Sequence, residues 1–319
     1  MNSEIALDNI VDAILKANRI VVFAHVSPDG DAVGSCLGMY FALEQLRKNV
    51  DIVTDEYSRC FAFLPGIGNI KTEVDDVYDL AIALDCATRP RLYDPKGAFD
   101  KARVTVNIDH HVSNTYYANY NYVEGESPAV CKTLVKVFKR LGVNVTQEIG
   151  TCLMAGIITD SGGFRYQTVD GETFEFAAQM IDIGVNISDI YYRTFDVKTK
   201  PQFMLSSIAT NRLEFYSKDR VAVTYVTQED FRNVNASAGD HEGIVNIGRN
   251  IEGVEVSIFL REVEPDLYRV SLRSNEYVNV SDIAGCFDGG GHSRAAGCDM
   301  HSDLKTSIKK LVRETNKYL

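Results

Sequence analysis

Runs of consecutive apolar residues, separated by helical patterns, constrain the fold of the first half of the chain most strongly. They occur at Arg19–His25, Leu80–Asp85 and Arg103–Asp109, and helices are expected at Val33–Lys48 and Pro128–Leu141. Apolar strands without polar alternation are typical of a parallel sheet that is covered by helices on both faces. We therefore predict an α/β fold with a parallel sheet for this part of the chain.

The second half has a different character, because alternating strands and shorter helical patterns follow one another from about residue 213. This pattern favours a smaller α+β domain. We predict a first domain over residues 1–190, a linker over residues 191–212 and a second domain over residues 213–319.

The composition limits the classes of partner. Lys and Arg number 33 and Asp and Glu number 44, which gives a net charge of −11 and disfavours wrapping of long duplex nucleic acid. No apolar run approaches the ~20 residues of a membrane span, and the N-terminal residues lack the pattern of a signal peptide. The seven cysteines include no CxxC pair, so we expect thiols in a reducing cytoplasm and no zinc–thiolate site.

Polar residues gather where the apolar strands end. His25 ends the first run and is followed by Asp29 and Asp31, Asp85 ends the second run, and Asp109-His110-His111 ends the third. Because ligands of parallel sheets bind beyond the carboxyl ends of the strands, we expect these side chains to converge. Each segment taken alone also fits an ordinary polar turn, with Asp31 as a helix cap.

Asp160, placed between an apolar segment and two glycines, adds a further carboxylate. A site of several carboxylates and a few imidazoles suits manganese, or magnesium less selectively. Two such ions, roughly 3.5–4 Å apart, would need one bridging carboxylate and would serve a phosphoryl displacement. The chain contains neither a GxSxG nucleophile motif nor a P-loop, which disfavours a serine hydrolase and a P-loop nucleotidase.

A glycine run near the C-terminus offers a second kind of chemistry. Gly289-Gly290-Gly291-His292 is followed by Arg294, and Arg273 ends a predicted strand. Glycine backbone can approach phosphate oxygens closely, and guanidinium groups bind them with two parallel donors. We favour phosphate capture here over the alternative of a simple loop.

The ordered set HxxxDxD, strand-end Asp, DHH, Asp and GGGHxxAAG resembles the DHH phosphoesterase superfamily. More closely, it is similar to the NrnA-type oligoribonucleases that also act as phosphatases of 3′-phosphoadenosine 5′-phosphate (pAp). The resemblance covers nearly the whole chain. It implies a DHH domain, a linker and a DHH-associated C-terminal domain, with the active site in the cleft between the two domains.

The resemblance also implies roles for individual residues. One manganese ion would be held by His25, Asp29 and Asp85, and a second by Asp31, Asp85, His110 and Asp160, with magnesium as a substitute. The catalytic group would comprise Asp85, Asp109, His110 and His111. Substrate would be bound by His111, Arg273, Gly290, Gly291, His292 and Arg294. One departure from the pattern that the resemblance implies is Gly125–Lys132, where a stretch richer in Ser and Thr is expected.

From these observations we expect a manganese-dependent phosphodiesterase and phosphomonoesterase that hydrolyses short oligoribonucleotides to mononucleotides and dephosphorylates pAp. Cyclic-dinucleotide or pApA hydrolysis is the main alternative, because the same site would serve. An inorganic pyrophosphatase-like hydrolase and a nucleotide-binding module without turnover stay open, whereas a RecJ-type exonuclease for long strands is disfavoured by the net charge. No membrane partner is expected, and a homodimer is left open.

Overall fold

The computed structural model describes residues 3–319, without the side chains of residues 3, 238 and 292. The chain forms two compact units, Met1–Val197 (unit 1) and Lys198–Leu319 (unit 2). The division falls within the stretch 191–212, which also contains the π-helical turn η4 (Tyr192–Asp196) and helix α8 (Lys200–Asn211). Each unit is described separately below.

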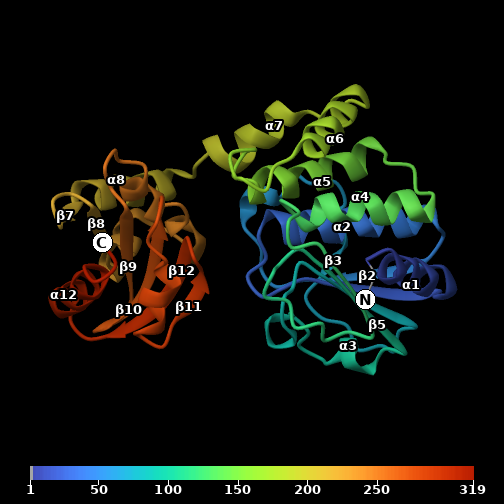
Figure 1. The fold of residues 1–319 in the computed structure, drawn as a ribbon, viewed down its shortest axis with the longest axis horizontal. Helices are drawn as coiled ribbons and strands as arrows, with labels where there is room; N and C mark the ends of the chain where they lie inside the picture. Colours follow the sequence, from blue (N-terminus) through green and yellow to red (C-terminus); the bar gives the residue numbers. More distant parts are fainter. Residues whose placement is uncertain (1–2) are drawn as a thin grey trace. The chain divides into compact units, whose positions relative to one another are not determined.

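Unit 1 is built on a six-stranded parallel sheet with the strand order β3-β2-β1-β4-β5-β6 (Figure 1). The strands are β1 (Arg19–Phe23), β2 (Asn49–Val53), β3 (Ile70–Lys71), β4 (Leu80–Leu84), β5 (Val104–Asp109) and β6 (Tyr120–Val123). The parallel sheet predicted from the continuous apolar runs is therefore confirmed.

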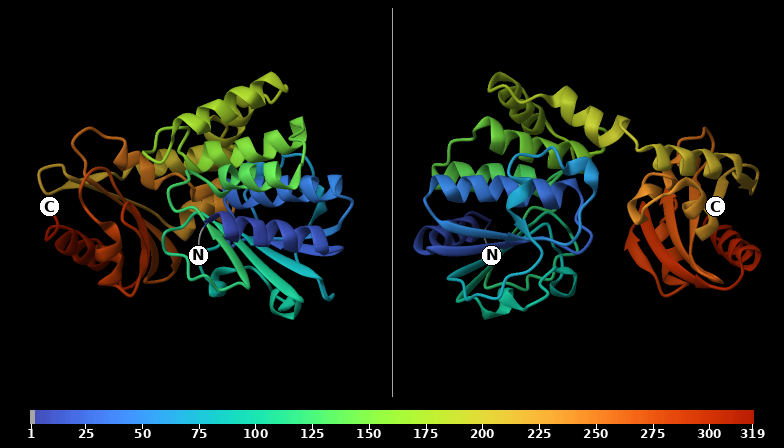
Figure 2. Two further views of the ribbon diagram at one scale, coloured as in Figure 1. Left: turned by 45° about the vertical axis from the view of Figure 1, so that its right-hand side comes forward. Right: turned by 180° about the vertical axis from the view of Figure 1, so that it is seen from behind.

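Both faces of this sheet are buried, which explains why its central strands are apolar throughout. In β1, Ile20 and Val22 join one core and Val21 and Phe23 join the other. The larger core contains residues of α1 (Ser3–Lys16), α2 (Gly30–Gln45), α4 (Val130–Leu141) and α5 (Gln147–Asp160). Helices α2, α4 and α5 lie on one face of the sheet in every view, and the short helix α3 (Ala98–Lys101) covers the other (Figures 1 and 2).

Helix α5 packs closely along α2, and this contact brings two functional segments together. A side chain at Gly34 of α2 would meet the backbone oxygen of Cys152 of α5 at 2.4 Å, so only glycine permits this approach. The remaining helical segments of unit 1 are α6 (Gly171–Asp182), α7 (Ile187–Tyr191), η1 (Arg59–Phe61), η2 (Ile67–Asn69) and η3 (Arg89–Arg91).

Unit 2 contains a six-stranded mixed sheet with the order β11-β12-β10-β9-β8-β7. Its β8–β9 pair is parallel and its other pairs are antiparallel. The strands are β7 (Glu214–Tyr216), β8 (Val221–Val226), β9 (Val256–Glu264), β10 (Leu267–Ser274), β11 (Gly290–His292) and β12 (Ala295–His301). The helices are α8, α9 (Gln228–Val234), η5 (Ala238–His241), α10 (Val245–Arg249), α11 (Val280–Gly285) and α12 (Leu304–Thr315). The expected smaller α+β domain is confirmed.

The glycine run forms a strand and the turn that leads into it. Gly290 and Gly291 belong to β11, which pairs with β12 through Gly290↔Gly297 and Gly291↔Ala296. Gly291 has a φ of +148°, and a side chain there would meet the backbone oxygen of Ala295 at 2.5 Å. Its glycine is therefore required by strand pairing, whereas a side chain at Gly290 would meet open space.

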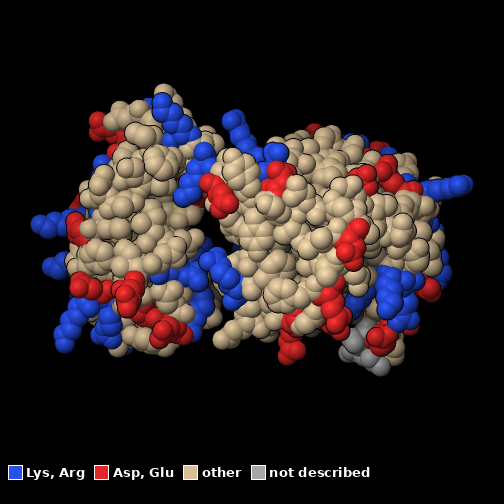
Figure 3. All heavy atoms as spheres, turned by 90° about the horizontal axis from the view of Figure 1, so that it is seen from above, with Lys and Arg blue, Asp and Glu red and all other residues tan. Residues whose placement is uncertain are grey.

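Among residues 3–319, no helix is both long enough and apolar enough to cross a membrane. On the face drawn in Figure 3, acidic and basic side chains are interspersed among neutral ones over both units. The negative charge is nevertheless shared unequally. Unit 1 carries 27 Asp and Glu against 17 Lys and Arg, whereas unit 2 carries 17 against 16.

Candidate active site

The site begins in the turn that joins β1 to α2. His25 follows β1 and is buried, and its Nδ1 lies 2.9 Å from the backbone oxygen of Val26. Asp29 is the N-cap of α2, where its Oδ1 accepts hydrogen bonds from the backbone N–H groups of Asp31 (3.0 Å) and Ala32 (3.1 Å). The turn at Pro-Asp-Gly-Asp therefore brings the carboxylates of Asp29 and Asp31 to the same site as the imidazole of His25.

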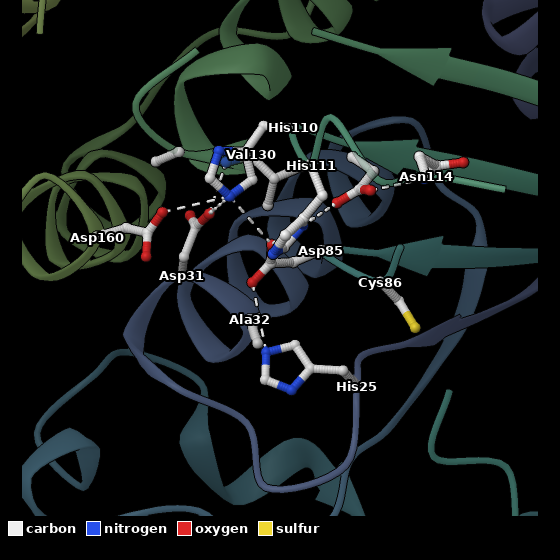
Figure 4. Close-up of polar contacts among 12 residues, drawn as sticks. His25, Asp31, Ala32, Asp85, Cys86, His110, His111, Asn114, Val130 and Asp160 are labelled. Carbon is white, nitrogen blue, oxygen red and sulfur yellow. Dashed lines mark hydrogen bonds and ion pairs between the residues drawn. The ribbon is translucent and has the colours of Figure 1, made fainter. Parts of the chain in front are cut away.

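Asp85 lies at the centre of the site, immediately after β4. Its backbone adopts a left-handed conformation with a φ of +51°, and its side chain is buried. Oδ2 lies 3.5 Å from His25 Nε2, and Oδ1 lies 3.4 Å from His110 Nε2 (Figure 4). Oδ1 is buried without a hydrogen-bond partner among the residues described. The two oxygens of this carboxylate thus face two different imidazoles.

His110 lies beside a second group of carboxylates. Its Nε2 lies 3.2 Å from Asp160 Oδ2 and 3.8 Å from Asp31 Oδ2, in addition to its contact with Asp85 (Figure 4). Its Nδ1 lies 3.0 Å from the backbone oxygen of Ser127. Since a carbonyl oxygen only accepts, Nδ1 must donate, which leaves Nε2 to face the carboxylates; the same argument applies to His25.

The side chain of Asp31 is fully buried and is held by the start of helix α4. The backbone N–H of Val130 donates to Oδ2 (2.5 Å), and that of Cys131 donates to Oδ1 (3.0 Å). Val130 and Cys131, within the stretch Gly125–Lys132, therefore position a candidate ligand through their backbone.

His111 points towards Asp85 from the same loop but has its own partner. Its Nδ1 lies 2.7 Å from Asp109 Oδ1 and 3.6 Å from Asp85 Oδ1. Asp109 is buried, and its Oδ2 accepts a hydrogen bond from Asn114 Nδ2 (2.6 Å), which also donates to Asn107 Oδ1 (2.8 Å). This chain of contacts fixes the orientation of the His111 ring.

The carboxylates of the site differ in their pKa values. Burial together with the charge of Asp85 raises the pKa of Asp31 to about 7, and burial together with the charges of Asp31 and Asp85 raises that of Asp160 to about 8. Burial alone would raise the pKa of Asp85 as well, but the imidazoles of His110 and His25 beside its carboxylate hold it well below its usual range. Burial would lower the pKa of His25, yet Asp29 and Asp85 raise it to about 11. The buried carboxylates therefore repel one another, and positive charge among them relieves the repulsion.

These observations fit a pair of divalent cations. Three groups of side chains have ligand atoms close enough to share an ion, namely His25–Asp29–Asp85, Asp31–His110–Asp160 and Asp85–His110–His111. An unpartnered buried oxygen, imidazoles whose outer nitrogen is fixed by a carbonyl, and crowded carboxylates are what a cation site requires. None of these groups contains a cysteine, and the Cys86 thiol donates to the backbone oxygen of Thr88 instead.

Apart from His111, the predicted substrate residues lie in unit 2, on and beside its sheet. Arg273 is in β10, half-buried, and its guanidinium donates to the backbone oxygen of Leu272 (2.9 Å). Arg294, between β11 and β12, donates to the backbone oxygens of Val278 (3.0 Å) and Glu276. The side chain of His292 lies outside the described part. Arg294 therefore also holds a turn of its own unit in place.

Sequence reasoning missed several residues that hold the site together. They are Asn107, Asn114, Ser127, Val130 and Cys131. Asn107 left a signal, because it is a polar residue inside an apolar strand and lies two positions before Asp109, on the same face. Ser127, Val130 and Cys131 act through their backbone, and no residue type marks that role.

Comparisons with known proteins agree with this fold. The DHH family, N-terminal domain, matches residues 19–157, and the DHHA1 domain matches residues 218–318. Together the two domains define a DHH phosphoesterase, a hydrolase that acts on phosphoester bonds.

Curated relatives indicate which type of DHH phosphoesterase the chain resembles. A Thermus thermophilus protein named bifunctional oligoribonuclease and PAP phosphatase NrnA is 30% identical over 316 residues, which cover 97% of this chain and 94% of the relative. A Bacillus subtilis protein of the same name is 24% identical over 320 residues, which cover 94% of this chain and 98% of the relative. The chain thus belongs to the DHH phosphoesterase family and is of the NrnA type.

Solved structures share the fold. An exopolyphosphatase-related protein from Bacteroides fragilis is 25% identical, with a TM-score of 0.91 and coverage of 99% of this chain and 96% of that one. RecJ from Thermus thermophilus, solved in complex with Mn²⁺, is 11% identical, with a TM-score of 0.56 and coverage of 99% of this chain and 55% of that one. The latter likeness concerns the fold alone.

Proposed function

We propose that this protein is a manganese-dependent phosphoesterase that hydrolyses short oligoribonucleotides to mononucleotides and removes a phosphate from pAp. The relatives named NrnA support the substrate class. We place the enzyme in the cytoplasm, in keeping with seven cysteines among which no disulfide forms within the described residues.

One observation carries the proposal. The two oxygens of Asp85 face His25 Nε2 and His110 Nε2 at 3.5 and 3.4 Å, and each imidazole has further carboxylates around it. A carboxylate shared in this way by two ligand groups is the arrangement that a two-cation phosphoesterase needs.

Asp85 belongs to both of the proposed ligand groups. We assign His25, Asp29 and Asp85 to one cation, and Asp31, Asp85, His110 and Asp160 to the other, with manganese as the ion and magnesium as a substitute. Two cations held there would neutralise charge on a phosphoryl group and would provide a nucleophile from water at neutral pH. The protein holds the ligands in place beforehand, through Asp85 after its strand and through the two α4 N–H groups on Asp31.

The other residues position the substrate. We assign His111 to the phosphate under attack, because Asp109 fixes its ring beside Asp85. In unit 2 we assign Arg273, Arg294, His292 and the glycines Gly290 and Gly291 to the rest of the nucleotide. A substrate with a second phosphate then gains orientation as well as affinity.

The proposal is tested by incubating the manganese-loaded protein separately with pAp, pApA, a five-nucleotide RNA, cyclic di-AMP and pyrophosphate. Chromatography of the products over time should show mononucleotides from RNA and pApA, and AMP with free phosphate from pAp. Turnover of pyrophosphate or cyclic di-AMP in preference to these substrates would replace the proposal by one of its alternatives. Binding of nucleotides without any product would indicate a module that lacks turnover.

A further inference from the structure

One face of the unit 2 sheet carries a row of arginines that extends away from Arg273. In β10, Tyr268, Val270, Leu272 and Ser274 are buried on one face, whereas Arg269, Ser271 and Arg273 alternate with them. Side chains two positions apart share one face of a strand. Arg269 and Arg273 therefore lie on the same face, roughly 13 Å apart along the strand at 3.3 Å per residue.

A third arginine lies directly beside Arg269. Arg261 of β9 is its cross-strand partner in the sheet register. Within the described residues, no hydrogen bond or ion pair engages the guanidinium of Arg261, and burial together with the charge of Arg269 lowers its pKa. Like charges placed opposite each other on neighbouring strands destabilise a sheet. An anion bound between them would remove that cost.

Only one counter-charge accompanies the pair in its own row. Asp299 of β12 is paired with Arg269 on the other side, with its Oδ1 3.6 Å from Arg269 Nε. Both of these side chains are more than half exposed, so the contact is screened by water. Two guanidinium groups with a single exposed carboxylate leave a local positive charge in a molecule of net charge −11.

On the β12 side, the positions between the two ends of the row are small residues, whereas on the β9 side the partner of Ser271 is the buried Phe259. Ser271 is paired with Gly297, and Gly297 is paired in turn with Gly290 of β11. Ala295 lies opposite Arg273. These positions are at least partly exposed, so a chain molecule can lie along the row without meeting a large side chain.

We propose that Arg261 and Arg269 form a second phosphate-binding position, beyond Arg273, for the backbone of an oligoribonucleotide longer than a dinucleotide. This inference rests on the proposed function, because it takes the bound polyanion to be the RNA substrate. A ligand with phosphates at one end engages Arg273 only. A longer strand engages both ends of the row, which favours longer RNA over pAp.

Binding of labelled RNA to the full-length protein in EDTA tests the proposal, because it reads affinity without turnover. We expect the double variant R261Q/R269Q to bind a five-nucleotide RNA at least about tenfold more weakly and to bind a dinucleotide as the wild type does. The slope of log affinity against log salt for the five-nucleotide RNA should become shallower by about 1.4, since two phosphate contacts are lost. D299N should bind it more tightly.

Two controls separate this effect from a change in fold or in general charge. R313Q removes an exposed arginine of α12, the helix packed on the opposite core of unit 2, and should bind both RNAs normally. R261K/R269K keeps the charge and should recover most of the affinity for the longer RNA.

Unchanged binding of the five-nucleotide RNA by R261Q/R269Q would overturn the inference, as would an equal loss for both RNAs. Hydrolysis by the wild-type protein is measured in parallel with manganese. Failure of the wild type to cleave either RNA would contradict the proposed function, whereas a loss of length dependence in binding alone concerns only the arginine row.

Discussion

The two units handle charge in opposite ways. Unit 1 holds ten of the eleven net negative charges, and its acidic residues include the buried cluster of Asp31, Asp85 and Asp109. Unit 2 is close to neutral, and its arginines Arg261, Arg269 and Arg273 lie on an accessible sheet face. The first unit is thus suited to cations and the second to the phosphates of a substrate.

The difference also concerns how each unit bears its charges. In unit 1, carboxylates are buried against one another, so burial raises the pKa of Asp31 and Asp160 and a cation is needed to balance them. In unit 2 the arginines Arg261, Arg269 and Arg273 are at least partly exposed, and water screens them. Loss of cations should therefore affect unit 1 strongly and unit 2 little. The following predictions test that contrast.

The largest effect is expected from removal of divalent cations. Dialysis against EDTA should abolish activity on pAp and RNA, and manganese should restore it better than calcium, which binds imidazole poorly. Hydrogen exchange should accelerate on EDTA treatment in peptides from α2, β4 and α4, and stay unchanged in the sheet of unit 2. Full activity in a sample shown by elemental analysis to lack metal would contradict the two-cation assignment.

The next effect is that of Asp85→Asn. Asparagine tolerates the left-handed backbone but cannot supply two charged oxygens, so kcat/KM should fall more than about 100-fold for diesters and for pAp alike. Asp94→Asn, which changes a buried carboxylate of unit 1 outside the site, is the matched control for loss of a buried charge. Retention of more than a tenth of the wild-type activity by Asp85→Asn would rule out a shared carboxylate.

Arg294→Ala should have an intermediate effect that depends on the substrate. Loss of a charge-assisted hydrogen bond to a second phosphate should lower kcat/KM for pAp and dinucleotides. The corresponding loss of transition-state stabilisation should be ~1.5–3 kcal/mol. An activated diester without a second phosphate should react nearly as before. Equal losses on both substrates would indicate that Arg294 acts through its hydrogen bonds to Val278 and Glu276, as a structural group of unit 2.

The smallest effect is expected at acid pH. Burial alone would raise the pKa of Asp170, but hydrogen bonds from Lys132 and Thr173 lower it to about 2. Because the folded pKa lies below the unfolded one, this contact stabilises unit 1 above about pH 4 and loses its effect as the pH falls towards 2. Asp170→Asn should remove that part of the acid dependence, on the order of 1 kcal/mol or less in chemical unfolding. An unchanged pH profile of unfolding in the variant would contradict the assignment.

The sequence predicted the core of unit 1 well because both faces of its sheet are buried. Such burial requires unbroken apolar strands, and the carboxyl ends of β1, β4 and β5 had to lie along one edge. The convergence of His25, Asp85 and His110 follows from that rule alone. It needs no knowledge of the loops between the strands.

Other features of the structure could not be predicted from the residue types in the sequence. Helix α5 is buried on nearly all sides, so its sequence lacks the polar stripe that reveals a helix, and Asp160 was placed only after an apolar segment of unassigned type. The glycine run reads as a loop, and its strand β11 exists only because Gly291 can pair closely with β12. The hydrogen bonds from Val130 and Cys131 to Asp31 are backbone contacts, which side-chain types do not encode.

The hydrogen bond between Asp31 and Val130 has a consequence for folding during synthesis on the ribosome. It joins residues 99 positions apart, and every proposed cation ligand precedes residue 161. At about 5–20 residues per second, translation of the remaining 159 residues takes roughly ten to thirty seconds. A nascent chain can therefore bring every proposed cation ligand together before unit 2 has been made.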